Sequence, residues 1–243
     1  KQMIKKIFFP FSILIFILAC IYSIHTYSIK IGLFDDIQIQ ISGNDYIDSQ
    51  RIKSEIYPQM SSSLLSVNLT DIQNKLNSID YIEAAQVSQI LPHTLMIQII
   101  ERSPVILMNN TDEITFMDKN GVLLPADEKS IGTFPVPVLS ILDDTGSMDQ
   151  YTGDIAQLFQ FLLDEYPLFY KKLSEVKIQK SVWEFYSDNN TKIYAHSSHL
   201  TNQLNILQVF EKTVHPLRDL QDYHYIDLRI KGQVIVKEKY RKG

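Results

Sequence analysis

The sequence predicts an α+β protein with a single N-terminal transmembrane helix, a small β-α-α-β-β domain, and a mixed β-rich domain with two helices. Residues 7–24 form a stretch without a charged side chain. Between residues 34 and 102, segments of alternating apolar and polar residues flank two segments with helical spacing. From residue 103 onward, short alternating segments joined by turn residues predominate, with two longer helical patterns among them.

The first predicted element is the membrane anchor. Its 18 largely apolar residues, 7–24, would rise about 27 Å as a helix, close to the hydrocarbon thickness of a bilayer. Lys1, Lys5 and Lys6 precede this stretch and favour a cytoplasmic N-terminus. We therefore expect a short cytoplasmic tail at residues 1–6, a transmembrane helix at 7–27, and the rest of the chain across the membrane.

Two other interpretations of the N-terminal segment compete with the anchor. A cleaved signal peptide has the same basic start and apolar middle, and Ile17-Leu18-Ala19-Cys20 is an imperfect lipidation box. The apolar run continues to Ile24, however, where a mature N-terminus is usually polar. Leu18 is also large for its position in such a box. We favour the uncleaved anchor, in which Cys20 is a small apolar residue of the helix.

The composition after Lys30 excludes some classes of protein. That part contains 28 acidic and 19 basic residues, a net charge of −9, which argues against a general nucleic-acid binder. It has no cysteine, so no disulfide framework holds it. Near the C-terminus the charge balance reverses, because the segment after Ile230 contains five basic residues and one acidic residue, Glu238. These residues either protect a sheet edge from aggregation or contact an acidic partner.

The first folded unit is predicted at residues 34–102. The elements expected in it are a strand at 37–41, a helix capped by Asp48 or Ser49, a second helix capped by Thr70, and strands at 85–89 and 95–100. Apolar residues recur at helical spacing in both helices. The order β-α-α-β-β, with two helices on one face of a three-stranded sheet, makes a compact α+β module.

The second unit is predicted at residues 103–243. The elements expected in it are a hairpin at 114–124 turning at Asn120-Gly121, an extended edge segment at 135–139, a helix from Gly153 to before Pro167, a strand at 176–178, a hairpin at 182–195, a helix at 200–214, and a last hairpin at 225–236. The last hairpin is expected to turn around Lys231-Gly232-Gln233.

The sequence gives no convincing catalytic, cofactor-binding or metal-binding residues. His196 and His199 have a spacing used by metal pairs on helices, but no third ligand lies near them in sequence. Asp143-Asp144 precedes Thr145-Gly146 and is best explained as turn chemistry. A Gly-rich phosphate loop, a nucleophile elbow and a zinc-protease helix are all missing from the sequence. We therefore expect a protein that is not an enzyme.

Several segments resemble the bacterial cell-division family FtsQ/DivIB. The run 91–105, Leu-Pro-His-Thr-Leu-Met-Ile-Gln-Ile-Ile-Glu-Arg-Ser-Pro-Val, resembles the junction motif of that family. Ile41-Ser42-Gly43-Asn44, Leu65-Ser66-Val67-Asn68 and Ile226-Asp227-Leu228-Arg229 resemble three other family segments. The resemblance identifies residues 34–102 as a POTRA-like domain and residues 103–243 as an FtsQ-type β domain.

The junction between the two predicted domains also has a direct physical interpretation. Pro104 cannot donate to a strand ladder and therefore fits a domain boundary. Glu101 and Arg102 are neighbours on opposite faces of a strand, so they cannot pair usefully with each other. We expect each of them to bond a residue of the following domain; the alternative is two solvated charges at a strand end.

The resemblance implies a non-enzymatic, membrane-anchored scaffold of the bacterial divisome. Members of the family link early and late division proteins at the septum and influence septal peptidoglycan synthesis. The implied partners are FtsB-like and FtsL-like bitopic proteins and other divisome components, without nucleic acid or a small-molecule substrate. The implied location is the cell inner membrane, with the C-terminal domains periplasmic. The alternative is an envelope-anchored lipoprotein or hydrolase of unknown substrate.

The expected binding mode is β-augmentation, in which a partner strand adds to an open sheet edge. Carried over from the family, the partner-binding residues lie in the last hairpin: Ile230, Lys231, Gly232 and Gln233, then Val234, Ile235 and Val236 supplying the paired backbone, and Lys237 and Lys239 contacting acidic side chains. Asp227 and Arg229 share one side of the preceding strand and are either an exposed pair or part of a binding face.

Overall fold

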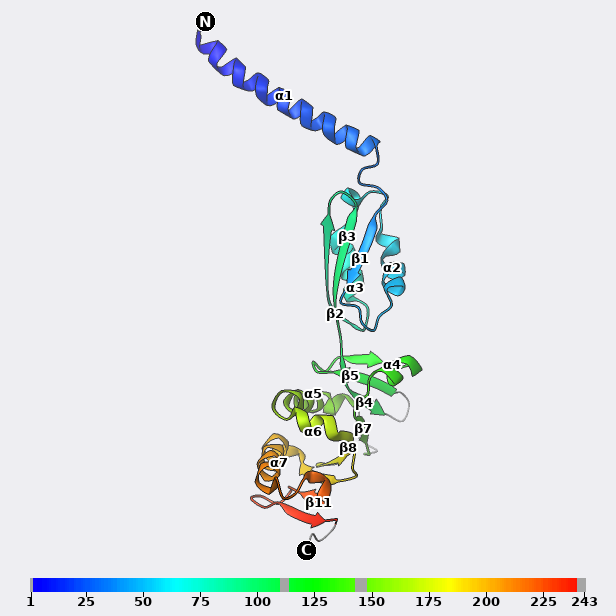
Figure 1. Cartoon of the computed structure of the whole chain (residues 1–243), viewed down its shortest axis with the longest axis vertical. Helices are drawn as coiled ribbons and strands as arrows, with labels where there is room; N and C mark the ends of the chain where they lie inside the picture. Colours follow the sequence, from blue (N-terminus) through cyan, green and yellow to red (C-terminus); the bar gives the residue numbers. More distant parts are fainter. Residues whose placement is uncertain (1, 110–113, 143–147, 240–243) are drawn as a thin grey trace. The chain divides into compact units, whose positions relative to one another are not determined.

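The computed structural model describes residues 2–109, 114–142 and 148–239, with the backbone alone for 2–12 and 148–150. Its internal contacts divide the chain into a first unit, Lys1–Arg102, and a second unit, Ser103–Gly243. Figure 1 traces the elements of each unit along the chain. The Asp143-Asp144 pair, which the sequence assigns to a turn, lies outside the described residues.

The chain starts with one long helix, α1 (Gln2–Lys30). Its last 18 residues, Ile13–Lys30, have a mean hydropathy of 1.6, and their side chains are not buried against the protein. Within the described residues this is the one helix long and apolar enough to cross a membrane. The helix extends three residues beyond the predicted end at residue 27, and it fits a single-pass membrane protein.

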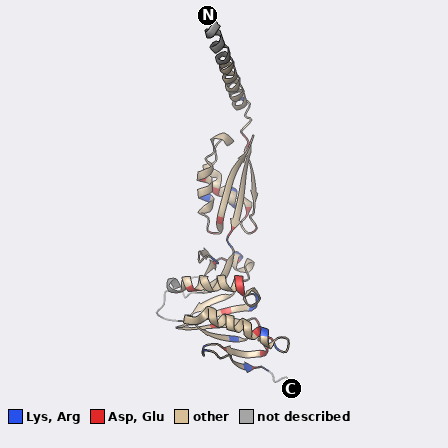
Figure 2. Ribbon diagram, turned by 90° about the vertical axis from the view of Figure 1, so that its left-hand side faces the viewer, with Lys and Arg blue, Asp and Glu red and all other residues tan. Residues whose placement is uncertain are grey.

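The first unit then forms β1 (Gln38–Ser42), α2 (Ser49–Ile56), α3 (Leu69–Asn77), β2 (Ile82–Ile90) and β3 (Thr94–Glu101). The predicted β-α-α-β-β order is confirmed. The sheet order is β1-β3-β2, with β1 parallel and β2 antiparallel to β3. Both helices cover one face of this sheet (Figure 2).

Buried aliphatic side chains fill the space between the helices and the sheet. Ile52 and Ile72 from the helices and Leu95 and Ile97 from β3 have no exposed surface. The side chain of Asp48 accepts a 2.7 Å hydrogen bond from the backbone N–H of Gln50 and caps α2, as predicted. The second helix is capped differently from the prediction.

Asn68, not Thr70, is the N-cap residue of α3. Its side-chain oxygen accepts a 3.1 Å hydrogen bond from the backbone N–H of Thr70. Asn68 therefore satisfies an amide at the start of the helix, and Thr70 provides that amide instead of capping it. The helix begins earlier than predicted because an amide side chain caps as well as a hydroxyl does.

The expectation that Glu101 bonds the following domain is wrong. Its carboxylate accepts hydrogen bonds from three consecutive backbone N–H groups of its own unit, those of Asp45 at 3.1 Å, Tyr46 at 2.8 Å and Ile47 at 2.8 Å. Because β1 runs parallel to β3, the loop that follows β1 lies beside the end of β3. The carboxylate therefore satisfies amides that would otherwise lack a backbone partner in this loop.

Gly43 makes the close approach of that loop to β3 feasible. Its φ is +80°, a region that residues with a Cβ rarely adopt. An added Cβ would lie only 2.1 Å from the carbonyl oxygen of Ile99. The position therefore requires glycine for two independent reasons, the backbone conformation and the space.

In its described residues, the second unit forms a nine-stranded sheet with helices packed on it. Its elements are β4 (Pro104–Asn109), β5 (Ile114–Asp118), β6 (Leu123–Pro125), α4 (Glu128–Thr133), β7 (Val138–Ile141), α5 (Met148–Glu165), α6 (Pro167–Lys172), β8 (Leu173–Gln179), β9 (Val182–Ser187), β10 (Lys192–His196), α7 (Leu200–Val214), β11 (Tyr223–Asp227) and β12 (Ile235–Glu238). The strand order is β12-β11-β10-β9-β8-β7-β4-β5-β6.

The predicted hairpins and both long helices are present. β5 pairs with β6, β9 pairs with β10, and β11 pairs with β12, each antiparallel. The long helices are α5 and α7, and the structure adds the short helices α4 and α6, each of six residues. Helix α5 begins at Met148, before Gly153, because a glycine inside a helix weakens it without ending it.

The prediction that residues 135–139 form an edge segment is wrong. The strand is β7, and it lies between β4 and β8, parallel to both. Pro135 and Pro137 precede the strand, so the missing N–H groups fall outside the ladder. Leu139 is fully buried in the strand, as its central position requires.

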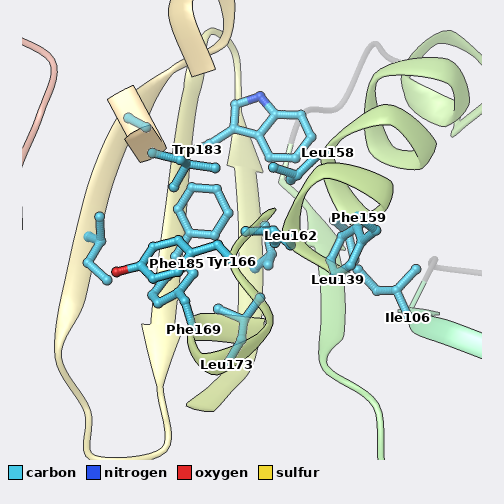
Figure 3. Packing of buried hydrophobic residues seen from close by; sticks show 14 of the residues in the cluster. Ile106, Leu139, Leu158, Phe159, Leu162, Tyr166, Phe169, Leu173, Trp183 and Phe185 are labelled. Atoms are coloured by element: carbon cyan, nitrogen blue, oxygen red, sulfur yellow. The ribbon is translucent and has the colours of Figure 1, made fainter. Parts of the chain in front are cut away.

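The core of the second unit lies between α5, α6, α7 and one face of the sheet (Figure 3). The Phe185 ring stacks with Trp183 at a centroid distance of 6.3 Å and contacts Phe169 at 6.1 Å. Phe159 and Leu162 of α5 are fully buried beside them. Burial of each such side chain contributes roughly 1.5–3 kcal/mol, so this aromatic cluster holds the helices on the sheet.

Candidate partner-binding edge

Strand β12 forms one end of the nine-stranded sheet and pairs only with β11 among the described strands. In the register of this antiparallel pair, Ile235 lies opposite Asp227, and Val236 lies opposite Ile226. The other side of β12 is therefore a sheet edge. Such an edge carries backbone groups that can pair with a strand of another chain.

The direction of these backbone groups follows from hydrogen bonds at both ends of the pair. The N–H of Lys239 donates to the carbonyl of Asp222 at 2.8 Å, so the backbone N–H and C=O of Lys239 point toward β11. The N–H of Leu228 donates to the carbonyl of Tyr194 at 2.9 Å, so the backbone groups of Leu228 point toward β10 and those of Asp227 point toward β12. Since backbone groups alternate along a strand, the N–H and C=O of Val236 and Glu238 face outward.

The side chains of β12 and of Val234, the residue that precedes it, divide between the two faces of the sheet. Val234 and Val236 are partly buried against the core cluster and attach the edge to the domain. Ile235 lies on the opposite face and is 37% exposed. Lys237 is exposed on that same face, and Figure 2 shows basic residues at this end of the domain. The face presented beside the edge is therefore apolar and basic.

The connection between the two strands differs from the predicted hairpin. Strand β11 ends at Asp227, three residues before the predicted end. Ile230, Lys231, Gly232 and Gln233 form an exposed turn, closed by a 3.1 Å hydrogen bond from the N–H of Gln233 to the carbonyl of Ile230. Of the predicted residues, these four lie in the turn, and only those from Ile235 to Lys237 belong to the strand.

Arg229 folds back onto the end of β11. Its side chain donates to the carboxylate of Asp227 at 2.9 and 2.6 Å, and its backbone N–H donates to the same carboxylate at 3.0 Å. The hydrogen bond from Arg229 holds the pKa of Asp227 below its usual value. The guanidinium also lies over the ring of Tyr194, 5.1 Å from its centroid. The pair is thus formed, and it borders the face that carries Ile235.

Lys239 contacts its own domain. Its Nζ donates to the carbonyl of Asn189 at 2.6 Å and lies 3.4 Å from the hydroxyl oxygen of Thr191. Thr191 is fully buried, and its hydroxyl directs its one proton between the carbonyl oxygens of Leu220, 3.0 Å away, and Tyr223, 2.8 Å away. No local pattern around Thr191 predicts this role, in which the residue fixes the start of β11 and, through Lys239, the end of β12.

The two histidines considered as a metal pair do not form a metal cluster. Nδ1 of His196 lies 2.9 Å from the hydroxyl of Ser198 and accepts a 3.3 Å hydrogen bond from the N–H of that residue. Across the described part of the chain, no three His, Cys, Asp or Glu residues are placed to hold a metal ion together. His196 serves the turn that leads into α7.

Comparison with protein families gives two consecutive matches. Residues 37–102 match the family "POTRA domain, FtsQ-type". Residues 106–229 match the family "Cell division protein FtsQ/DivIB, C-terminal". The second match covers about half of the chain and ends before β12, so the candidate edge lies just beyond it.

Individual relatives agree with these matches. The cell division protein FtsQ of Rickettsia bellii is 24% identical over 201 residues, 82% of this chain and 70% of that protein. The cell division protein DivIB of Clostridium acetobutylicum is 30% identical over 99 residues, 41% of this chain and 40% of that protein. A solved structure of the major extracytoplasmic domain of DivIB from Geobacillus stearothermophilus is 15% identical, with a TM-score of 0.33, and the match covers 43% of this chain and 87% of that chain.

Proposed function

Because this chain belongs to the FtsQ/DivIB family of cell division proteins, we propose that it is a non-enzymatic, membrane-anchored scaffold of the divisome. In this role it links early and late division proteins at the septum and influences septal peptidoglycan synthesis through protein contacts. The N-terminus is cytoplasmic and the two domains are periplasmic. The matches to both family domains in tandem, behind one apolar helix, carry this proposal.

The partners proposed are FtsB-like and FtsL-like bitopic division proteins, which bind at β12 by β-augmentation. The outward N–H and C=O groups of Val236 and Glu238 would pair with a partner strand. Exposed Ile235 and Ile230 would add apolar contact beside that strand. Lys231 and Lys237, both exposed, would meet acidic partner side chains and favour their approach.

The contacts of the remaining predicted residues refine the proposal. Gly232 has a φ of +75° and an added Cβ would meet no atom within 4 Å, so it shapes the turn that ends at β12. Lys239 is engaged with Asn189 and supports the edge instead of contacting the partner. The side chain of Val234 packs on the core cluster and has the same supporting role.

The orientation of the backbone groups gives a sharp test. Val236→Pro removes an N–H that faces outward, and proline is tolerated on such an edge. Val236→Ala changes the same side chain but keeps the N–H, so it is the matched control. Binding of the full chain in detergent to the extracytoplasmic segment of the FtsB-like protein from the same organism is measured, with circular dichroism to confirm folding.

We expect Val236→Pro to weaken this binding at least tenfold, and Val236→Ala to change it less than threefold. Ile235→Pro is a poorer test because it removes a donor that faces β11 and therefore disturbs the domain itself. Unchanged binding by folded Val236→Pro would place the interface elsewhere on the protein. Failure of the unmodified chain to bind would reject the FtsB-like partner.

A further inference from the structure

The exposed apolar side chains of the first unit gather at one of its ends. Beyond α1, the large apolar residues that are exposed in the described part of this unit are Ile31, Leu33, Tyr57, Leu65, Ile90, Leu91 and Ile100. All except Ile100 belong to the connection from α1 to β1, to the segment between α2 and α3, or to the end of β2 and the turn after it. The strand directions bring these segments together, because β1 and β3 start at this end and β2 finishes there.

Hydrogen bonds join the three segments into one surface. The backbone N–H of Leu64 donates to the carbonyl of Phe34 at 2.8 Å, and the N–H of Gln38 donates to the carbonyl of His93 at 2.8 Å. The side chain of Gln89 donates to the carbonyl of Leu64 at 2.6 Å. Figure 1 shows the start of β1 and the turn between β2 and β3 at the same end of the unit. We call this surface the apolar end, and it consists of Ile31, Leu33, Tyr57, Leu65, Ile90 and Leu91.

The segments that meet at the apolar end carry little charge. Residues 37–44, 57–70 and 84–100 contain no Lys, Arg, Asp or Glu. The charged groups that border them at this end are the carboxylates of Asp35, Asp36 and Asp71. Contiguous exposed apolar surface of this kind marks a contact with a protein or with a membrane. Because the bordering charges are negative, attraction to acidic groups cannot hold such a contact, and burial of apolar surface must.

The length of α1 places its last residue at the surface of a bilayer. The helix has 29 residues and rises about 43 Å. A bilayer with its headgroup layers is roughly 40–45 Å thick. When α1 spans the membrane, Lys30 therefore lies at the outer edge of the headgroups.

The connection from α1 to the apolar end is short. Four residue steps lead from Lys30 to Phe34, whose carbonyl is already bonded to Leu64. A chain extends at most about 3.6 Å per residue, so this fixed point lies within about 14 Å of the helix end. Even a single helix is roughly 10–12 Å wide with its side chains. A folded partner domain therefore does not fit between the membrane and the apolar end, which leaves the bilayer itself as the neighbour.

We propose that the apolar end inserts its side chains into the surface of the bilayer that α1 crosses. Leu65 and Leu91 enter the boundary between headgroups and acyl chains, and the ring of Tyr57 lies at the level of the headgroups. Because α1 keeps the surface beside the membrane, a contact that is weak on its own is still formed. The contact limits the tilt of the first unit on the membrane, and it does not depend on the partners proposed for β12.

Spin labels at the two ends of the first unit test this contact. The full chain with Cys20→Ser receives one new cysteine, by Leu91→Cys or, as the matched control, by Ile100→Cys. The two native side chains are 60% and 61% exposed. Each labelled chain is placed in phosphatidylcholine nanodiscs, one copy per disc, so that no second copy can cover the surface. Electron paramagnetic resonance then measures how often the label collides with a water-soluble nickel chelate. We expect collisions at least about threefold rarer at position 91 than at position 100, because lipid excludes the chelate.

A second substitution shows whether the native side chains make the contact. Leu65→Ser in the chain labelled at position 91 removes apolar surface and should raise the collision frequency about twofold. Leu123→Ser changes an equally exposed leucine of the second unit and should leave it unchanged. Circular dichroism confirms that both variants are folded. Adding phosphatidylglycerol to the nanodiscs should not increase the protection, because the apolar end offers no basic group to an anionic lipid. Equal collision frequencies at positions 91 and 100, or protection that requires phosphatidylglycerol, would overturn the proposal.

Discussion

The carboxylate of Glu101 accepts a 2.8 Å hydrogen bond from the backbone N–H of Ile47. Glu101 is the last residue of β3, and Ile47 lies in the loop that leads from β1 to α2. The same carboxylate holds the two preceding amides of that loop. One side chain at the end of the first unit therefore fixes the connection between its first strand and its first helix.

Replacing Glu101 by Ala should destabilise the first unit. Three charge-assisted hydrogen bonds are lost, so we expect its free energy of unfolding to fall by about 2 kcal/mol. Hydrogen exchange of the amides of residues 45–47 measures the effect directly, because these amides lose their acceptor. Glu101→Gln keeps an acceptor oxygen and should retain part of the protection. Equal protection in Glu101→Ala and in the unmodified chain would contradict the role assigned to this carboxylate.

Gly43→Ala should disrupt the same loop from its other end. The methyl group would lie 2.1 Å from the carbonyl oxygen of Ile99, at a residue with a φ of +80°. We expect the free energy of unfolding of the first unit to fall by about 2 kcal/mol or more. Circular dichroism during urea unfolding checks this.

Gly153→Ala is a matched control for the change of Gly43, with the opposite expected sign. Gly153 lies in α5, and an added Cβ would meet no atom within 4 Å. Alanine is about 1 kcal/mol better than glycine inside a helix, so the second unit should become more stable. If both alanine substitutions had the same effect, the steric explanation for Gly43 would be wrong.

The pair of Asp227 and Arg229 should make the second unit sensitive to acid. The pKa of Asp227 is lowered in the folded protein by the hydrogen bond from Arg229. The pair therefore contributes stability above the unfolded pKa of Asp, about 3.9, and that stability is lost as the pH falls through the lower folded pKa.

Fluorescence of Trp183, the single tryptophan, can follow unfolding of the second unit at several pH values. Asp227→Asn removes the titrating group, so the free energy of unfolding should fall less steeply as the pH is lowered below about 4. Lys237→Gln changes a neighbouring charge on β12 and should leave the steepness as it is. An unchanged pH dependence in Asp227→Asn would show that the pair does not stabilise the fold.

Periodicity predicted the elements of both units well, because side-chain burial repeats with the period of each element. The alternation of residues 37–41 and 95–100 marks β1 and β3, and the apolar spacing after residue 200 marks α7. The alternation of apolar and polar residues within a strand does not show which other strands pair with it in the sheet. Pro135 and Pro137 therefore suggested an edge, although β7 lies between two parallel strands.

At the candidate edge, too, the local sequence pattern does not show where a strand ends or what its side chains contact. Alternation continues from Tyr225 to Ile230, so it predicts a longer strand than the structure contains. The strand ends at Asp227 because its carboxylate accepts the backbone N–H of Arg229 two residues later, a turn typical of aspartate. The bond of Lys239 to Asn189 joins residues 50 apart in sequence. Such contacts depend on the tertiary structure and have no local signal.

The central position of β7 has a consequence for the folding kinetics of the second unit. Residue Val138 of β7 pairs with Leu107 of β4 on one side and with Glu175 of β8 on the other. Both pairings require closure of a chain segment of more than 30 residues, which is slow compared with closure of a hairpin. We expect the β8–β9–β10 meander to gain amide protection first in pulse-labelled refolding, and β7 to join the two parts of the sheet in the rate-limiting step.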